Sequence, residues 1–229
     1  MSLIDICFPK FCLGCGRTGN YLCPNCDQQL KRVIKDGCFY CHKNSPHGLT
    51  HIICRKKNGI DGVMSFFYYD NLLKKIIKKI KYRLSYEVWS EIKHLVRIED
   101  LEKLSFFAKT GRGYYLLPVP LSEAKLKIRG FNQAKLICQY FNKYLKLPIF
   151  DAMEKIKETA SQAEIKDKKQ RSLNQKGAFD ITEKKEVMNN NFIIIDDVVT
   201  TGATVREICR LLKRYGAKKV YVLTLAKGS

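Results

Sequence analysis

Residues 193–204 read IIIDDVVTTGAT, and this stretch determines how the rest of the chain is interpreted. Three isoleucines in a row are typical of a strand that is buried on both faces of a parallel sheet. The run ends at Asp196 and Asp197, so these carboxylates lie where the core stops and avoid the full cost of desolvation. Small residues and threonines follow, and we expect a helix to begin near Val205.

Apolar strand patterns and amphipathic helix patterns alternate along most of the chain. The predicted strands are residues 62–69, 114–121, 189–197 and 218–226, and the predicted helices are residues 71–84, 134–145 and 203–217. Such alternation predicts an α/β fold, with a parallel sheet and helices on its faces. Ligands then bind outside the carboxyl ends of the strands. Residues 159–177 are polar, basic and weakly periodic, which predicts a mobile excursion.

The turn after Asp197 has the composition of a phosphate-binding site. It contains Thr200, Thr201, Gly202, Ala203 and Thr204. Hydroxyls, a glycine that permits close backbone approach and the free amides of a helix start together form an anion cradle. Aspartates one step earlier can accept hydrogen bonds from sugar hydroxyls or hold a cation indirectly. The chain has no Gly-x-x-x-x-Gly-Lys motif, which excludes the P-loop of nucleotide hydrolases.

Ten cysteines are concentrated near the N-terminus, eight of them before residue 55. Seven of them lie in three Cys-x-x-Cys pairs and one His-x-x-Cys pair, a spacing that favours metal binding over disulfides. Two tetrahedral zinc sites are expected, with the ligands Cys12, Cys15, Cys23 and Cys26 for the first and Cys38, Cys41, His51 and Cys54 for the second. For the second site His42 and His47 are alternative ligands, and Cys7 is a buried thiol or a spare ligand. We expect a structural zinc-ribbon module at residues 1–57, followed by a larger domain at residues 58–229.

The charge balance is strongly basic. Forty-two Lys and Arg residues against 22 Asp and Glu residues give a formal net charge of +20. This excess attracts polyanions, of which nucleic acid is the first candidate, an anionic membrane the second and phosphorylated small molecules the third. A generally Lys-rich proteome is the alternative explanation for the same composition.

The predicted helix at residues 71–84 has a lysine face. Its basic residues are Lys74, Lys75, Lys78, Lys79 and Lys81, opposite an arc of leucines and isoleucines. A solvated helix face is the ordinary interpretation. However, these lysines have no acidic neighbour at helical spacing, so their mutual repulsion favours an anionic partner. Nucleic acid fits better than lipid, because flanking Trp or Phe anchors of the interfacial kind are missing.

Targeting features are not visible in the sequence. The N-terminal residues show no basic region followed by an apolar run. No stretch reaches the roughly 18 uninterrupted apolar residues of a membrane span. We therefore expect a cytoplasmic protein, with peripheral attachment at the inner face of the cytoplasmic membrane as a further option.

Two resemblances extend this interpretation. The stretch 193–204 resembles the phosphoribosyl-pyrophosphate (PRPP) loop of type I phosphoribosyltransferases. Residues 119–134 (VPLSEAKLKIRGFNQA), Gln162 and residues 171–179 (RSLNQKGAF), behind an N-terminus of cysteine pairs, resemble the ComF family of competence proteins. The second resemblance covers nearly the whole chain. It implies a double zinc ribbon before a phosphoribosyltransferase-like domain and a part in DNA uptake during natural transformation.

The resemblance also implies roles for single residues. Asp196 and Asp197 would hold the ribose hydroxyls of PRPP, and the five residues of the threonine turn would wrap its 5′-phosphate. Magnesium would bind mainly through the diphosphate. Lys125 and Arg129 would be the nearest cations to that diphosphate, although Arg129 could simply order its loop. On the basic excursion, Arg171 and Asn174 would cover the site or contact DNA.

Two functions follow from these features. The first is a protein that binds and handles single-stranded DNA during natural transformation and carries a PRPP-binding site. The second is an active phosphoribosyltransferase that acts on an unidentified nitrogen acceptor. The expected partners are single-stranded DNA, PRPP and, by resemblance, a competence helicase or DNA-translocation component. Because no nucleobase-reading segment is recognisable, DNA handling is the preferred interpretation.

Overall fold

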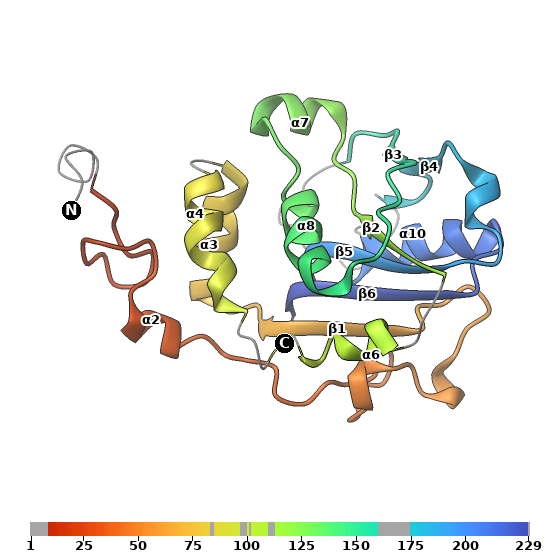
Figure 1. The fold of residues 1–229 in the computed structure, drawn as a ribbon, viewed down its shortest axis with the longest axis horizontal. Helices are drawn as coiled ribbons and strands as arrows, with labels where there is room; N and C mark the ends of the chain where they lie inside the picture. The colour runs from red at the N-terminus through yellow and green to blue at the C-terminus, as the bar shows by residue number, and fades with distance from the viewer. Residues whose placement is uncertain are drawn as a thin grey trace.

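The computed structural model describes residues 9–82, 85–96, 100, 102–109, 113–159 and 175–228. A parallel sheet of four strands in the order β1-β6-β5-β2 forms its centre (Figure 1). The strands are β1 (Gly62–Tyr68), β6 (Lys219–Lys227), β5 (Asn191–Val199) and β2 (Tyr114–Pro118). All three strand pairings are parallel, so the carboxyl ends of the strands meet at one edge. The α/β fold with a parallel sheet is therefore confirmed.

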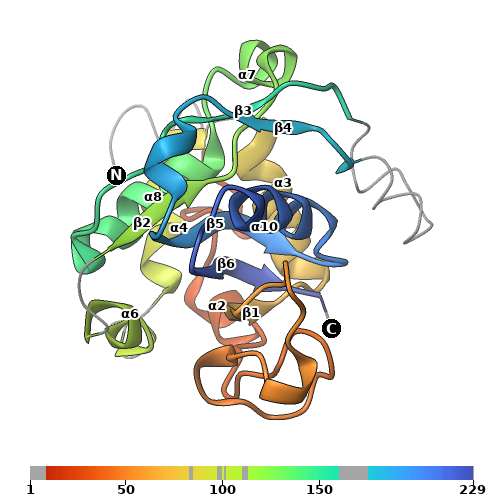
Figure 2. The same cartoon turned by 90° about the vertical axis from the view of Figure 1, so that its right-hand side faces the viewer.

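The isoleucine run lies in the middle of this sheet, because β5 pairs with β2 on one side and β6 on the other. Ile193 and Ile195 belong to the same core cluster as residues of α8 (Gln133–Leu145). Ile194 points to the opposite face, where it packs in a second cluster with residues of α10 (Ala203–Arg214). Figure 2 shows α10 lying over the strands. Both faces are covered, which explains the absence of polar alternation along β5.

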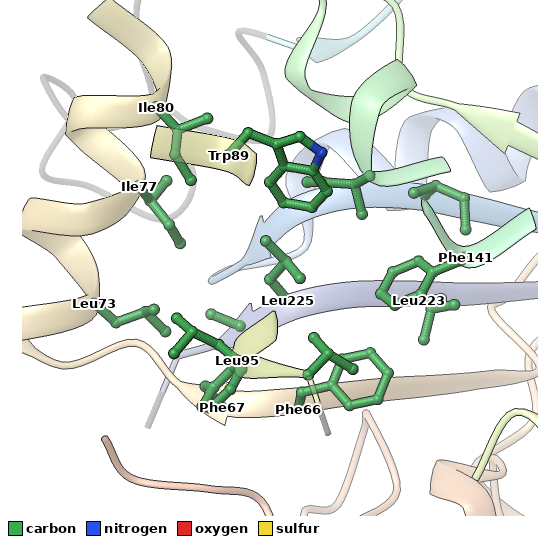
Figure 3. Close-up of a cluster of buried hydrophobic side chains, with 14 of the residues drawn as sticks. Phe66, Phe67, Leu73, Ile77, Ile80, Trp89, Leu95, Phe141, Leu223 and Leu225 are labelled. Atoms are coloured by element: carbon green, nitrogen blue, oxygen red, sulfur yellow. The ribbon is translucent and has the colours of Figure 1, made fainter. Parts of the chain in front are cut away.

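The lysine-faced helix packs at the strand ends. It is α3 (Asn71–Tyr82), followed by α4 (Ser85–Ile92) and the short η3 (Lys93–Leu95). Leu73, Ile77 and Ile80 point from α3 toward the sheet, where the cluster includes Phe67 and Leu225 (Figure 3). In the described part of the predicted apolar arc, Leu73, Ile76, Ile77 and Ile80 are buried in the core, and Leu72 is partly buried against it. The short α6 (Ser105–Lys109) adds Phe107 to the same cluster.

Several short elements surround the carboxyl edge of the sheet. They are α7 (Glu123–Arg129), β3 (Met153–Lys155) and β4 (Phe179–Ile181). The short η4 (Lys184–Val187) precedes β5 and lies on the side of its amino end. Strands β3 and β4 form an antiparallel ribbon of their own. The sequence predicted neither α7 nor this ribbon. Each is too short to build a hydrophobic period, so tertiary contacts determine its structure.

The cysteine-rich segment runs along the free edge of β1 (Figure 1). It contains α2 (Pro24–Gln28), η1 (Pro46–Gly48) and η2 (Ile52–Cys54). Backbone hydrogen bonds join it to the sheet: Val33 donates to Phe66 and Tyr68 donates to Lys31, both at 2.8 Å. The boundary between residues 57 and 58 stays a prediction. Among the residues described, no helix has the length and apolar character needed to cross a membrane.

Candidate functional site

A cavity of about 330 Å³ opens at the carboxyl ends of the strands. Asp196, Asp197, Thr200 and Thr204 contribute from the end of β5 and the turn that follows it. The other walls come from α3, from α7 and from the β3–β4 ribbon. The location agrees with the general rule that parallel sheets bind ligands outside the carboxyl ends of their strands.

The two aspartates differ in charge. Asp197 is 6% exposed, and its Oδ2 lies 2.5 Å from Nζ of Lys81. Burial opposes ionisation of Asp197, yet the ammonium of Lys81 keeps the pKa of this carboxyl below its usual value. For Asp196, burial and the neighbouring negative charge raise the pKa well above its usual value. The cavity thus contains one ionised carboxylate and one that resists ionisation, and both can bond to hydroxyl groups.

The turn beyond the aspartates leads directly into α10. Gly202 is its N-cap and has a φ of 73°, a left-handed conformation that side chains disfavour. Ala203 N donates to Oγ1 of Thr201 at 3.4 Å, and Arg206 N donates to the carbonyl of Gly202 at 2.8 Å. The amides of the first helical turn, which have no carbonyl partner within the helix, lie beside the cavity. Together with the hydroxyls of Thr200 and Thr204 they form a suitable cradle for a phosphate.

Positive charge lines the cavity from another side. Lys125 and Arg129 project from α7, and Lys155 projects from the end of β3. Both lysines bond to Thr159, Lys125 Nζ to its carbonyl at 2.9 Å and Lys155 Nζ to its hydroxyl at 2.5 Å. Gln175 is almost fully buried and donates to the same hydroxyl at 3.2 Å. Three cations around one cavity suit a ligand with several negative charges, such as a diphosphate.

Two ligand clusters lie in the cysteine-rich segment. The first consists of Cys12, Cys15, Cys23 and Cys26, and the second of Cys38, Cys41, His51 and Cys54. Within each cluster the ligand atoms lie within 4.8 Å of one another. A tetrahedral zinc site with bonds of about 2.3 Å needs sulfur atoms about 3.8 Å apart. The residues therefore fit a zinc ion, and all nine cysteines in the described part of the chain are free thiols rather than disulfides.

Local contacts favour the metal-binding state of these side chains. The Sγ atoms of Cys15 and Cys23 are 3.7 Å apart. Burial opposes thiolate formation at Cys12, yet backbone amides that donate to its sulfur lower its pKa to about 6. In the second cluster His51 Nδ1 lies 3.2 Å from Cys41 Sγ, and its Nε2 lies 3.1 Å from the carbonyl of Asn44. Since a carbonyl can only accept, Nε2 carries the hydrogen and donates to it, and the lone pair of Nδ1 remains available for a metal.

The alternative ligands are not part of the second cluster. His47 stacks on Phe106 with ring centroids 4.9 Å apart, and His42 is exposed. Cys7 lies outside the described residues. Among the candidates in the described chain, His51 is therefore the histidine that joins the cysteines.

Known proteins resemble the chain over most of its length. A model of the phosphoribosyl transferase domain family matches residues 128–229. The chain is 30% identical over 221 residues to the DNA utilization protein YhgH of Escherichia coli (strain K12), covering 94% of this chain and 88% of that relative. It is 26% identical over 214 residues to Competence protein F of Haemophilus influenzae, covering 91% of each. It is also 26% identical over 218 residues to Competence protein ComFC of Bacillus subtilis, covering 90% of this chain and 84% of that relative.

The chain belongs to the ComF family of competence proteins. Its phosphoribosyl transferase match begins in α7 and includes both the β3–β4 ribbon and the turn after β5. The match therefore contains most walls of the cavity. The wall formed by α3 precedes the match in sequence, and so do both cysteine clusters.

The environment of one lysine of α3, Lys81, differs from the prediction. The sequence placed Lys81 on a solvated face without an acidic partner, but its ammonium is ion-paired with Asp197 inside the cavity. Lys74, seven positions earlier on the same face, also lines the cavity. Lys75 and Lys78 are exposed, and Lys79 is partly exposed. The cause is the position of α3, whose last turns reach the end of β5.

Sequence reasoning also missed functional candidates on the ribbon. Lys155 and the Thr159–Gln175 hydrogen bond were not anticipated, since no motif marks a strand as short as β3. The pKa of Lys155 is lowered to about 8, because burial and the charge of Lys125 outweigh the carboxylates of Glu158 and Asp196. The predicted excursion residues Gln162, Arg171 and Asn174 lie outside the described residues.

Proposed function

We propose that this ComF family member binds and handles single-stranded DNA during natural transformation and carries a PRPP site in its cavity. Relatives are named for competence and for DNA utilization, and this supports the proposal. One observation carries it: Lys74 and Lys81 of α3 line the same cavity as Asp196 and Thr200. The basic helix thus opens onto the phosphate-binding turn, and both features serve phosphate-bearing ligands.

In this proposal PRPP occupies the cavity along its charged walls. Asp196 and Asp197 accept hydrogen bonds from the ribose hydroxyls, and the turn of residues 200–204 wraps the 5′-phosphate. Lys125 and Arg129 contact the diphosphate. Magnesium would be held mainly through the diphosphate and would supply charge neutralisation there.

Single-stranded DNA follows the exposed lysines of α3. Lys75, Lys78 and Lys79 contact backbone phosphates, and Lys74 links this surface to the cavity. Such contacts are independent of base sequence and weaken with salt, because bound counterions are released. The net charge of +20 adds to the attraction at long range. Arg171 is proposed as a further DNA contact from outside the described part.

The metal clusters complete the proposal. Each holds one zinc ion and stabilises a segment that is too small to fold around a core of its own. We propose that the protein works in the cytoplasm or at the inner face of the cytoplasmic membrane, together with a competence helicase or DNA-translocation component.

Calorimetric titration with PRPP and magnesium tests the cavity. We expect saturable binding by the wild type and a loss of at least about ten-fold in affinity for Asp196→Ala, since a ribose contact disappears. Glu183→Ala is the matched control, because this exposed acid lies outside the cavity wall. An affinity unchanged by Asp196→Ala would refute the site assignment.

Fluorescence anisotropy with a labelled oligonucleotide tests DNA binding. We expect an affinity that falls steeply with rising salt. The titration is repeated with PRPP present, and any change in DNA affinity must equal the change that DNA causes in PRPP affinity. No binding at low salt, or binding with no negative salt slope, would refute the DNA proposal.

An active phosphoribosyltransferase is the second candidate. Lys125, Arg129 and Lys155 share the cavity with Asp196, where they can stabilise the negative charge of a departing diphosphate. In the reaction a nitrogen of the acceptor bonds to C1 of the ribose, the bond from C1 to the diphosphate oxygen breaks, and the nitrogen releases a proton. Release of diphosphate that depends on an added nitrogen acceptor and is lost in Lys155→Met would support this candidate. PRPP binding without such release would leave DNA handling as the function.

A further inference from the structure

The loop between two ligands of the second cysteine cluster contacts the turn of residues 200–204, called the phosphate turn below. Phe39 lies between Cys38 and Cys41, in the knuckle that supplies two ligands of this cluster. A Cβ placed on Gly202 would lie 2.3 Å from Cζ of Phe39. The ring therefore occupies the space that a side chain at this position would need. The turn and the knuckle are in direct contact.

The same knuckle also contacts the first turn of α10. The guanidinium of Arg206 lies 4.4 Å from the ring centroid of Phe39 and 5.0 Å from that of Tyr40. Cation–π contacts of this kind stabilise the relative position of both partners. Arg206 lies in α10, two residues after the turn of residues 200–204. The knuckle therefore contacts both the turn, at Gly202, and the helix that follows it, at Arg206.

Tyr40 connects the knuckle to the sheet domain. Its hydroxyl accepts a hydrogen bond from the backbone amide of Ile60 at 3.0 Å, just before β1. Thr50 adds a second link, since its hydroxyl donates to the carbonyl of Ile60 at 2.7 Å. Hydrogen bonds to Ile60 thus anchor the segment around the knuckle to the sheet domain, while Phe39 packs against Gly202.

Metal ligation is the interaction best placed to fix the shape of this knuckle. A four-residue loop has no core of its own, and its two rings, Phe39 and Tyr40, contact each other edge to face with centroids 5.4 Å apart. Ligation of Cys38 and Cys41 closes such a loop and fixes its backbone. Without the ion, the loop gains freedom and the rings lose their fixed positions.

We propose that the second cysteine–histidine cluster, when it holds its metal ion, positions the phosphate turn of residues 200–204 through Phe39. Metal occupancy of this cluster then determines how well the turn binds a phosphate group. The first cluster has a different neighbour, since a Cβ on Gly14 in its knuckle would lie 3.3 Å from Leu72 of α3. That the phosphate group belongs to PRPP is taken from the proposed function, on which this inference rests.

Removing one metal at a time tests the inference. Cys54→Ser removes a ligand of the second cluster outside the knuckle that carries Phe39, and Cys15→Ser removes a ligand of the first. A zinc-sensitive dye should report a loss of one ion per chain in either variant. Hydrogen exchange of the amides at residues 198–206, without PRPP, should become about ten-fold faster in Cys54→Ser and stay unchanged in Cys15→Ser.

Aromatic substitutions test the contact without removing a ligand. We expect Phe39→Ala to keep both zinc ions, to accelerate exchange in the turn and to weaken PRPP binding about ten-fold. Phe11→Ala is the matched control, because Phe11 neighbours Cys12 of the first cluster and is 53% exposed. This pair of variants remains informative if Cys54→Ser does not fold.

The outcomes separate the inference from the proposed function. If the wild type does not bind PRPP, the proposed function fails, while the exchange measurement still reports on the contact. If exchange in the turn stays the same after loss of the second metal ion and in Phe39→Ala, the inference is overturned whatever PRPP does. If Cys15→Ser has the same effect on the turn as Cys54→Ser, the two clusters act together and the specific role of the second is refuted.

Discussion

The two cysteine clusters are alike in ligand spacing but contact different parts of the cavity wall. The first lies against α3 and α4, where Gly14 approaches Leu72 and the amide of Leu22 donates to Glu91 at 3.2 Å. The second lies against the phosphate turn through Phe39. A repeated metal-binding motif thus supports the basic helix at one end and the anion cradle at the other. Loss of metal from the first cluster should therefore weaken DNA binding more than PRPP binding, and loss from the second should do the reverse.

The basic helix α3 and the strand that leads into the turn of residues 200–204 meet at an ion pair in the cavity. Lys81 comes from α3, on the side of the first cluster, and Asp197 comes from the strand that leads into the phosphate turn. Burial lowers the pKa of Lys81, but the negative charge of Asp197 more than compensates and raises it above its ordinary value. Breaking this pair should test whether the two parts depend on each other.

Asp197→Ala should have the largest effect on stability. It leaves the ammonium of Lys81, whose side chain is 26% exposed, without its partner. We expect the free energy of unfolding in urea to fall by about 3 kcal/mol, because a partly buried ammonium loses the carboxylate that neutralises it. The pKa of Asp197 is lowered in the folded protein, so the contribution of the pair is present at neutral pH and is lost as pH falls through that pKa.

A double variant provides the control. Lys81→Met with Asp197→Leu replaces the pair by apolar side chains of similar size, and most of the lost stability should return. If the double variant is as unstable as Asp197→Ala, the loss comes from packing at the end of β5 and the pair does not link the two parts.

Gly202→Ala should have the second-largest effect on stability. Its φ of 73° costs a side chain roughly 1 kcal/mol, and the contact with Phe39 adds to that cost. We expect a total loss of about 2 kcal/mol, measured by urea unfolding, together with weaker PRPP binding. Gly130→Ala is a matched control, since Gly130 has a φ of 76° and no atom within 4 Å of its added Cβ.

Phe39→Ala gives a second control for the same glycine. In that background the added methyl group has room, so Gly202→Ala should cost only the backbone contribution seen for Gly130→Ala. Equal costs for Gly202→Ala with and without Phe39 would mean that the knuckle does not press on the turn.

The sheet and the position of the turn at residues 200–204, between β5 and α10, were predictable because their signals are local. The isoleucines of β5 are consecutive in sequence, and the residues of the turn follow directly, so one short stretch contains both. The cysteine pairs are similarly local, and both predicted ligand sets are brought together in the structure. Local patterns are read reliably because their geometry is fixed by the backbone itself.

The remaining parts of the site depend on contacts between distant segments. Lys81 looked solvated, because its acidic partner Asp197 lies on another element. Lys155 carries no motif and reaches the cavity only through the β3–β4 pairing. The contact of Phe39 with Gly202 joins two segments from opposite ends of the chain. No periodicity or spacing specifies such contacts, which depend on how the elements pack.

The pH dependence of PRPP binding should report on Lys155. Burial, with smaller contributions from Lys125 and Arg129, lowers the pKa of Lys155 to about 8 without ligand, and Glu158 and Asp196 oppose this shift. An anionic ligand stabilises the ammonium and raises this pKa, so binding above pH 8 requires uptake of a proton. We expect affinity to fall by up to about ten-fold per pH unit above pH 8.

Calorimetry in two buffers with different ionisation enthalpies measures that proton uptake. The uptake should be absent in Lys155→Met and retained in Lys127→Met, because Lys127 is an exposed lysine of α7 that does not line the cavity. Proton uptake that persists in Lys155→Met would assign the titration to another group and remove Lys155 from the diphosphate site.

Lys78→Gln should have the smallest effect and sharpens the contrast between the two ends of the cavity. Lys78 is exposed on α3 and does not line the cavity. Loss of one phosphate contact should weaken binding of single-stranded DNA by about five-fold at 0.1 M salt and reduce the salt slope by about 0.7. PRPP affinity should not change. Lys185→Gln is the control, since this exposed lysine lies in η4, before the start of β5 and therefore away from its carboxyl end. Equal losses in both variants would mean that DNA responds to the net charge of the protein, and that α3 provides no specific surface for it.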